Sequence, residues 1–166
     1  IQSYEKLADQ GSRTMEEILR LDGAGEIKWM LETHDAWIDP DCCSLLLQRI
    51  TSSAFGILWD VGHTARMGNA PHHEIFKTIG CRTYYTHIKD AILDPSHPQA
   101  MKDGWRYVAP GKGSLRLKEA IALLKEKAYQ GWIMLEHEKR WYADLEEPEV
   151  FFPQFVAWAN PLIGIK

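Results

Sequence analysis

The sequence has no hydrophobic run long enough to cross a membrane. A helix that spans a bilayer needs about 20 consecutive apolar residues, whereas the apolar stretch at 42–47 is short and is interrupted by Ser44. The first residues are polar, without the basic and then apolar pattern of a signal peptide. We therefore expect neither a membrane span nor a membrane partner. A chain that opens on Ile1 rather than on methionine is also expected to be a piece of a longer protein.

Cysteine is scarce, and positive charge is nowhere concentrated. The three cysteines, Cys42, Cys43 and Cys81, form no C-x-x-C pair. This spacing excludes a disulfide framework and a structural zinc site, and it favours a reducing, cytoplasmic compartment. The chain has 19 Lys and Arg against 23 Asp and Glu, a formal charge of -4, without a stretch dense in basic residues. We therefore expect no nucleic-acid partner.

Apolar runs of strand length alternate with segments of helical periodicity along the chain. We expect strands at Ile27–Glu32, Phe55–Trp59, Thr83–Ile88 and Gly131–Leu135. We expect helices over Ser3–Leu21, from Pro40 to about Thr51, from Pro71 to Ile79, from a cap at Ser114 through Ala128, and from Pro148 onward. This alternation predicts an α/β fold with a parallel sheet and right-handed crossovers. Because we see no linker or repeat in the 166 residues, residues 1–166 are expected to form a single domain.

Each expected strand delivers an ionisable residue at or near its carboxyl end, namely Glu32, Asp60, His87 and Glu136. Ligands bind at the carboxyl ends of the strands in parallel α/β sheets and barrels. Three carboxylates and one imidazole suit Mn²⁺ or Mg²⁺, with Co²⁺ or Zn²⁺ as further candidates, and they do not suit a metal that prefers thiolates. A single strand-end carboxylate is more often a helix cap or a solvated residue, but four in succession favour one divalent metal site.

Further polar residues share the faces of these strand ends. Side chains alternate along a strand, so Glu32 shares a side with His34, His87 with Lys89, and Glu136 with Glu138. Four of the five remaining histidines fall into two groups. His63 follows Asp60 closely and is expected to contact substrate or a metal ligand, whereas His72, His73 and His97 are expected to be solvated.

Five motifs together resemble the xylose isomerase-like TIM barrels, and within them the sugar phosphate isomerase/epimerase group. They are L-E-T-H at 31–34, W-D-V-G-H at 59–63, T-H-I-K-D at 86–90, P-G-K-G at 110–113 and G-W-I-M-L-E-H-E at 131–138. The resemblance continues into P-E-V-F-F-P-Q-F-V at 148–156, which is similar to the last helix of that group. The order and spacing of the motifs are specific, whereas any one of them alone would be a weak signal.

The resemblance implies a partial barrel of (β/α) TIM-barrel type. A complete barrel takes about 250 residues, so 166 residues hold about four βα units, preceded by a helix. These units would correspond to strands five to eight, which makes the chain the C-terminal half. Activity is then expected of the full-length parent rather than of this truncated chain.

The resemblance also implies a set of roles. One divalent metal would be bound by Glu32, Asp60, His87 and Glu136, and Glu32 and Glu136 would also move the proton of a sugar or polyol through an enediolate. The substrate would be contacted by His34, His63, Lys89 and Glu138.

Three other functions stay open. The loop A-I-L-D-P-S at 91–96 lacks the arginine common in epimerases of the group, so an inosose-type dehydratase is an alternative. A metal-dependent apurinic endonuclease would need a D-x-H, which Asp103-Gly104-Trp105 does not supply. The third alternative is a non-catalytic remnant that binds metal or sugar.

Two further expectations concern the surface. The interval from His87 to Glu136 is longer than the two earlier intervals between expected ligands, and we expect the segment 91–113 within it to form a lid or an oligomer contact. Apolar first and last strands without a partner on one side recruit other strands. A homo-oligomer is therefore expected.

Overall fold

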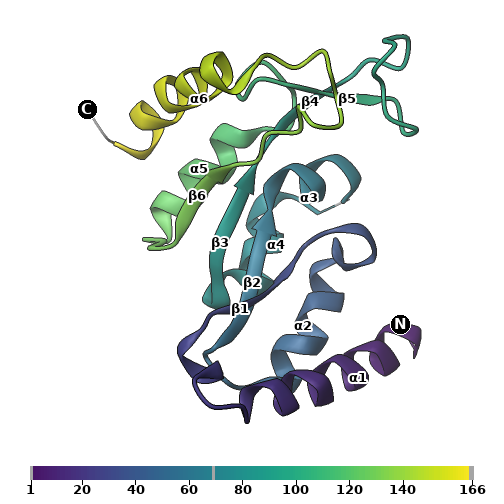
Figure 1. Ribbon diagram of the computed structural model, residues 1–166, viewed down its shortest axis with the longest axis vertical. Helices are drawn as coiled ribbons and strands as arrows, with labels where there is room; N and C mark the ends of the chain where they lie inside the picture. The colour runs from purple at the N-terminus through teal and green to yellow at the C-terminus, as the bar shows by residue number, and fades with distance from the viewer. Residues whose placement is uncertain (1, 69, 165–166) are drawn as a thin grey trace. The chain divides into compact units, whose positions relative to one another are not determined.

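The structure, a computed structural model, describes residues 2–68 and 70–164 (Figure 1). The chain divides into two compact units, Ile1–Thr86 and His87–Lys166. The elements of the first unit are α1 (Gln2–Leu19), η1 (Ala24–Glu26), β1 (Trp29–Glu32), η2 (Asp35–Trp37), α2 (Pro40–Arg49), β2 (Phe55–Asp60), α3 (Val61–Met67), α4 (His72–Ile79), η3 (Gly80–Arg82) and most of β3 (Thr83–Ile88). The second unit holds the end of β3, β4 (Asp90–Leu93), β5 (Trp105–Val108), α5 (Leu117–Glu126), β6 (Trp132–Leu135) and α6 (Pro148–Ile163). Strands alternate with helices as predicted, so the α/β fold is confirmed.

The first unit is built on parallel strands. β1 pairs with β2 in a parallel register that sets Trp29 opposite Phe55 and Glu32 opposite Leu58, and β3 is the next strand after β2. β2 is almost wholly buried, as expected for a central strand that reads as a continuous apolar run. The register brings the carboxyl ends of β1 and β2 side by side.

Helices α1 and α2 lie next to each other beside the strands of this unit (Figure 1). Ala8 of α1 packs with Leu46 and Ile50 of α2 and with Phe55 of β2 in one buried cluster. At the surface of this cluster, the Arg49 guanidinium bonds the carboxylate of Asp9 at 2.7 Å and that of Glu5 at 2.5 Å. Apolar burial and one shared cation therefore join α1 to α2.

Helix α2 has side-chain partners at both of its ends. The Asp39 carboxylate accepts a hydrogen bond from the Asp41 amide at 2.9 Å, and Pro40 occupies the first turn, as the sequence predicts. At the other end, the Arg82 guanidinium donates to the carbonyls of Leu47 and Ile50. Carbonyls of a last helical turn have no partner within the helix, so a residue distant in sequence satisfies them here.

The first unit differs from the sequence-based expectations in two further places. The segment after Asp60 forms the helix α3, which the sequence does not predict. The expectation that His72 is solvated is also wrong, because this side chain is 5% exposed. Its ring lies edge-on to the fully buried Trp59, which also contacts Phe76 of α4.

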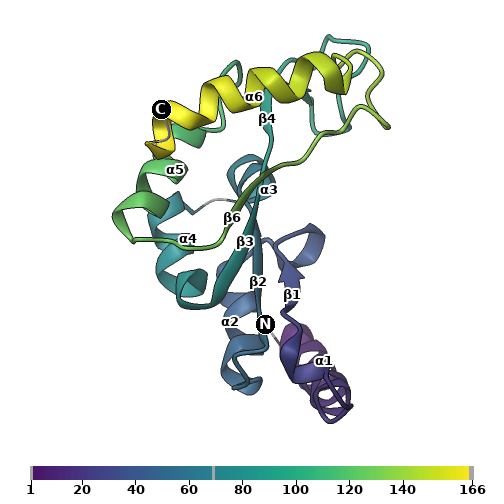
Figure 2. The same ribbon diagram turned by 60° about the vertical axis from the view of Figure 1, so that its left-hand side comes forward.

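The second unit combines a strand end with a hairpin and two helices. β6 is the neighbour of β3, and the Glu136 amide donates to the Ile88 carbonyl at 3.0 Å. β4 and β5 pair in an antiparallel manner from Asp90 opposite Val108 to Leu93 opposite Trp105. Helices α5 and α6 pack against each other (Figure 2). The segment expected as a lid therefore contains an ordered hairpin.

The expected cap of α5 is wrong. The helix begins at Leu117 after Arg116, which has a left-handed backbone with φ 54° and makes no side-chain cap. The Ser114 hydroxyl instead donates to the Ala91 carbonyl at 3.4 Å, and the Ser114 amide bonds the same oxygen at 2.9 Å. Ser114 thus joins the loop to β4 rather than capping the helix.

Across residues 2–68 and 70–164, none of the helices is both long enough and apolar enough to pass through a membrane.

The three cysteines differ sharply in burial, which predicts their reactivity. Cys42 and Cys43 are buried, and Cys81 is exposed. Burial raises the pKa of the Cys43 thiol to about 12, with Cys42 and Asp39 adding to the effect, and burial also raises the pKa of Cys42. Because the thiolate is the reactive form, we expect a disulfide reagent at pH 8 to modify Cys81 alone in the folded chain, and all three thiols after denaturation. Rapid modification of Cys43 in the folded chain would contradict this packing.

Candidate functional site

The carboxylate of Asp60 lies at the end of β2 and begins the next helix. Its side chain is fully buried, and Oδ1 accepts a hydrogen bond from the His63 amide at 2.8 Å as the N-cap of α3. Oδ2 lies 3.6 Å from Nε2 of His63. Because the cap uses Oδ1, the same carboxylate could cap α3 and bind a metal through Oδ2.

Thr33 holds the backbone of Asp60 in place. It follows Glu32 at the end of β1 and is fully buried. Its hydroxyl oxygen accepts a hydrogen bond from the Asp60 amide at 2.8 Å, and the Thr33 amide donates to the Leu58 carbonyl at 3.0 Å. The ends of β1 and β2 are thus joined by a side chain as well as by their backbones.

Two histidine rings lie together beside these strand ends. The centroids of His34 and His63 are 4.0 Å apart, with the rings tilted by 54°. His63 is 6% exposed, and its Nδ1 lies 3.4 Å from the Arg66 guanidinium. His34 is more open and pairs with Asp35 at 3.0 Å. The first unit therefore brings Glu32, Asp60, His34 and His63 to the carboxyl ends of β1 and β2.

A buried lysine organises the carboxylates of the second unit. The Lys89 side chain is 3% exposed, and its Nζ lies 2.6 Å from Oε2 of Glu136 and 3.2 Å from Oε1 of Glu138. The same Glu136 oxygen is 3.3 Å from Nδ1 of His87. The ammonium also lies 5.7 Å from the centroid of the Tyr107 ring. A buried cation needs such partners, because an unpaired charge in the interior is costly.

The surroundings of Glu136 keep it ionised. Burial by itself raises the pKa of this carboxyl, but hydrogen bonds from His87 and Lys89, together with their charges, outweigh burial and lower the pKa to about 2. Glu136 is therefore a carboxylate throughout the neutral range. An anionic oxygen of this kind can bind a cation.

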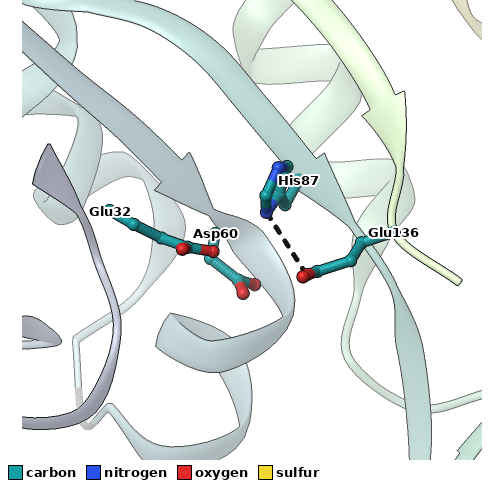
Figure 3. Close-up of side chains that lie close together, drawn as sticks. All are labelled: Glu32, Asp60, His87 and Glu136. Carbon is teal, nitrogen blue, oxygen red and sulfur yellow. Dashed lines mark ion pairs between the residues drawn. The ribbon is translucent and has the colours of Figure 1, made fainter. Parts of the chain in front are cut away.

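Glu32 and Asp60 of the first unit, and His87 and Glu136 of the second, each offer one atom that could bind a metal (Figure 3). Glu32 and Asp60 are the last residues of β1 and β2, His87 lies near the end of β3, and Glu136 follows β6 directly. Figure 3 shows each side chain and the ion pair between His87 and Glu136. Carboxylate oxygens and an imidazole nitrogen are donor atoms that divalent cations accept in proteins.

The structure adds residues that sequence reasoning missed. Thr33 lies within the L-E-T-H motif but carries no sign of its bond to Asp60, which depends on the strand register. Arg66 lies one helical turn after His63, a spacing that is informative only once α3 is known. Lys89 and Glu138, expected as substrate contacts, bond each other. Their contact with substrate stays a prediction.

The buried Thr33 hydroxyl gives a prediction about stability. Replacing Thr33→Val keeps the shape of the side chain but leaves the Asp60 amide without its acceptor. We expect the free energy of unfolding to fall by about 1–3 kcal/mol, the cost of a buried unsatisfied donor. Urea unfolding of Thr33→Val and of the control Thr33→Ser measures the difference. Equal stability of the two variants would show that the hydroxyl does not hold the Asp60 backbone.

Curated relatives of this chain match part of it. The chain is 33% identical over 103 residues to the inosose dehydratase of Bacillus thuringiensis (strain Al Hakam), an alignment that covers 56% of this chain and 34% of that protein. The chain thus spans about a third of the length of that relative.

Solved structures share the fold. A D-tagatose 3-epimerase-like protein superposes with a TM-score of 0.63 at 22% identity, covering 95% of this chain and 57% of that one. The xylose isomerase domain protein from Planctomyces limnophilus superposes with a TM-score of 0.53 at 22% identity, covering 79% of this chain and 46% of that one. At such identities the likeness concerns the fold alone.

A family model assigns the chain directly. The model described as "Xylose isomerase-like TIM barrel" matches residues 2–153, which is most of the sequence. The resemblance seen in the motifs is therefore confirmed, and the chain belongs to the xylose isomerase-like TIM barrel family.

Proposed function

We propose that Glu32, Asp60, His87 and Glu136 bind one divalent cation, with Mn²⁺ or Mg²⁺ favoured and Co²⁺ or Zn²⁺ as alternatives. The observation that carries the proposal is the donor set itself, with one ligand from each strand end of the parallel sheet. Clustered carboxylates would otherwise repel one another.

The proposed reaction is metal-assisted proton transfer on a sugar or polyol, as in an isomerase or epimerase. Glu32 and Glu136 take a proton from the carbon next to a carbonyl and return it, so that the substrate passes through an enediolate. A bound divalent cation supplies positive charge that acidifies this C–H bond. His34 and His63 lie together where they can orient hydroxyl groups, and Lys89 is placed beside Glu136.

A dehydratase is the second candidate, and one observation favours it. The inosose dehydratase of Bacillus thuringiensis is similar to this chain over 103 residues. Dehydration begins with the same proton abstraction and differs in the next step, in which a hydroxyl leaves instead of a proton returning. Both candidates concern the whole protein, since this chain spans only part of its relatives. Homo-oligomer formation likewise stays a prediction.

The metal site is tested by titration. We expect the chain to bind Mn²⁺, and we expect Glu136→Gln and His87→Ala each to weaken binding by about tenfold or more, or ~1.4 kcal/mol. Isothermal titration calorimetry measures the affinities. Glu74→Gln is the matched control, because Glu74 is an exposed carboxylate on α4. If the Glu136 and His87 variants bind Mn²⁺ as the unaltered chain does, the ligands are misassigned.

The chemical step is tested by isotope exchange in D₂O. With the full-length parent, Mn²⁺ and a panel of keto-sugars and inososes, we expect deuterium to enter the carbon next to the carbonyl. Glu32→Gln should reduce this exchange and Glu74→Gln should not. Mass spectrometry separates the two candidates, because an epimer keeps its water and a dehydration product has lost it. Metal binding without any exchange would identify a binding protein and overturn the catalytic proposal.

A further inference from the structure

Asp90 is a buried carboxylate whose partners are backbone amides. The residue is 3% exposed and lies at the start of β4, directly after Lys89. Its Oδ2 accepts hydrogen bonds from the amides of Gly111 at 2.9 Å and Gly113 at 3.0 Å. Its Oδ1 accepts from the amides of Ala91 at 3.0 Å and Leu115 at 3.3 Å. Four N–H groups therefore converge on one side chain.

The loop that supplies three of these amides is shaped around the carboxylate. Gly111 has φ +86°, a left-handed backbone that residues with side chains rarely adopt. A Cβ atom at Gly113 would lie 2.0 Å from Oδ1 of Asp90, so the backbone approaches the carboxylate too closely for any other residue. Successive amides that point into one concavity are the structure that binds anions in many proteins. In this loop the concavity contains a side chain of the same chain.

The neighbouring Lys89 is also buried, and it pairs with carboxylates of the segment after β6. Its ammonium is directed to Glu136 and Glu138. Two consecutive buried residues therefore have opposite charges and different partners, with Asp90 held by amides and Lys89 held by carboxylates. The hydrogen bonds of Asp90 fix the backbone next to Lys89. The Lys89 ammonium in turn bonds Glu136, the carboxylate proposed to bind metal.

We propose that the Asp90 carboxylate occupies an anion-binding site formed by backbone amides, which we call the nest. Asp90 also acts as a positioning residue for Glu136, through Lys89. The nest comprises the amides of Ala91, Gly111, Gly113 and Leu115. It anchors the 109–115 loop to the junction between β3 and β4, and this junction sets the direction of the Lys89 side chain. The amides of the P-G-K-G motif are thereby committed to an internal carboxylate rather than to a phosphate group. The effect on Glu136 rests on the proposed metal site, whereas the nest itself does not.

Chemical rescue tests the nest. Asp90→Ala removes one carboxylate, and formate is a carboxylate of the missing size. We expect amide hydrogen exchange at Gly111, Gly113 and Leu115 to accelerate by about tenfold or more in Asp90→Ala, since each lost bond involves a charged acceptor. Added formate should slow the exchange again, and chloride at equal concentration should not. Asp90→Asn, which keeps one carbonyl oxygen, should give an intermediate rate.

Asp94→Ala is the matched control. Asp94 is a carboxylate of the same β4–β5 connection that pairs with Arg106 at 2.9 Å and lies outside the nest. Its replacement should leave the three loop amides protected, and formate should have no effect on them. If formate protects Asp90→Ala no better than chloride does, the amides do not form an anion site and the proposal is overturned.

Metal titration tests the positioning role separately. We expect Mn²⁺ affinity to fall about tenfold in Asp90→Ala and to recover with formate, after correction for the effect of formate on the unaltered chain. Normal affinity in Asp90→Ala alongside weak affinity in Glu136→Gln would overturn the positioning role. If the unaltered chain binds no Mn²⁺, the proposed function and this positioning role both fail, and the exchange experiment still decides the nest.

A second variant covers the case in which Asp90→Ala does not fold. Gly113→Ala keeps the carboxylate but places a methyl group against Oδ1 of Asp90. We expect the same faster exchange at Gly111 and Leu115, without rescue by formate, because the anion is still present. Unchanged exchange in Gly113→Ala would show that the carboxylate does not depend on this close approach.

Discussion

The requirement that buried charge be paired governs the carboxyl ends of these strands. Asp60, Lys89 and Asp90 are all nearly inaccessible to solvent, and each ion needs compensation that water no longer supplies. The chain supplies it in three ways. A helix amide bonds the Asp60 carboxylate, two carboxylates compensate Lys89, and four loop amides compensate Asp90. Each of these solutions fixes a backbone position near a proposed metal ligand.

The candidate site combines partly open residues with buried residues that support them. The residues proposed to act on substrate, such as Glu32 and His34, are partly open, whereas Thr33 and Asp90 are buried. A site of this kind depends on groups that never touch the substrate. Epimerases and dehydratases can then share one framework, since proton abstraction requires the same placement of carboxylates and the next step depends on other residues.

Much of the site could be predicted from the sequence because strands end where their apolar runs end. Glu32, Asp60, His87 and Glu136 each lie at or near such an end, and parallel pairing brings ends together. The helix α3 was missed because V-G-H-T-A-R-M has little apolar periodicity, and its start depends on the Asp60 cap. The β4–β5 hairpin was missed because the Pro- and Gly-rich segment within it resembles a loop. Ser114 was misassigned because a serine before a helix is a cap only if its hydroxyl faces the helix amides.

The contact between Arg82 and the carbonyls at the end of α2 has a consequence for the order in which the first unit forms. Arg82 is far from Leu47 in the sequence, so the last turn of α2 lacks its final partner until η3 has been synthesised and docked. On the ribosome, where chains emerge from the amino terminus, α2 would fray at this end while β2 and α4 are being made. When Arg82 docks, it completes the hydrogen bonds of the last turn of α2. The end of this helix and the fold of the first unit are therefore completed together.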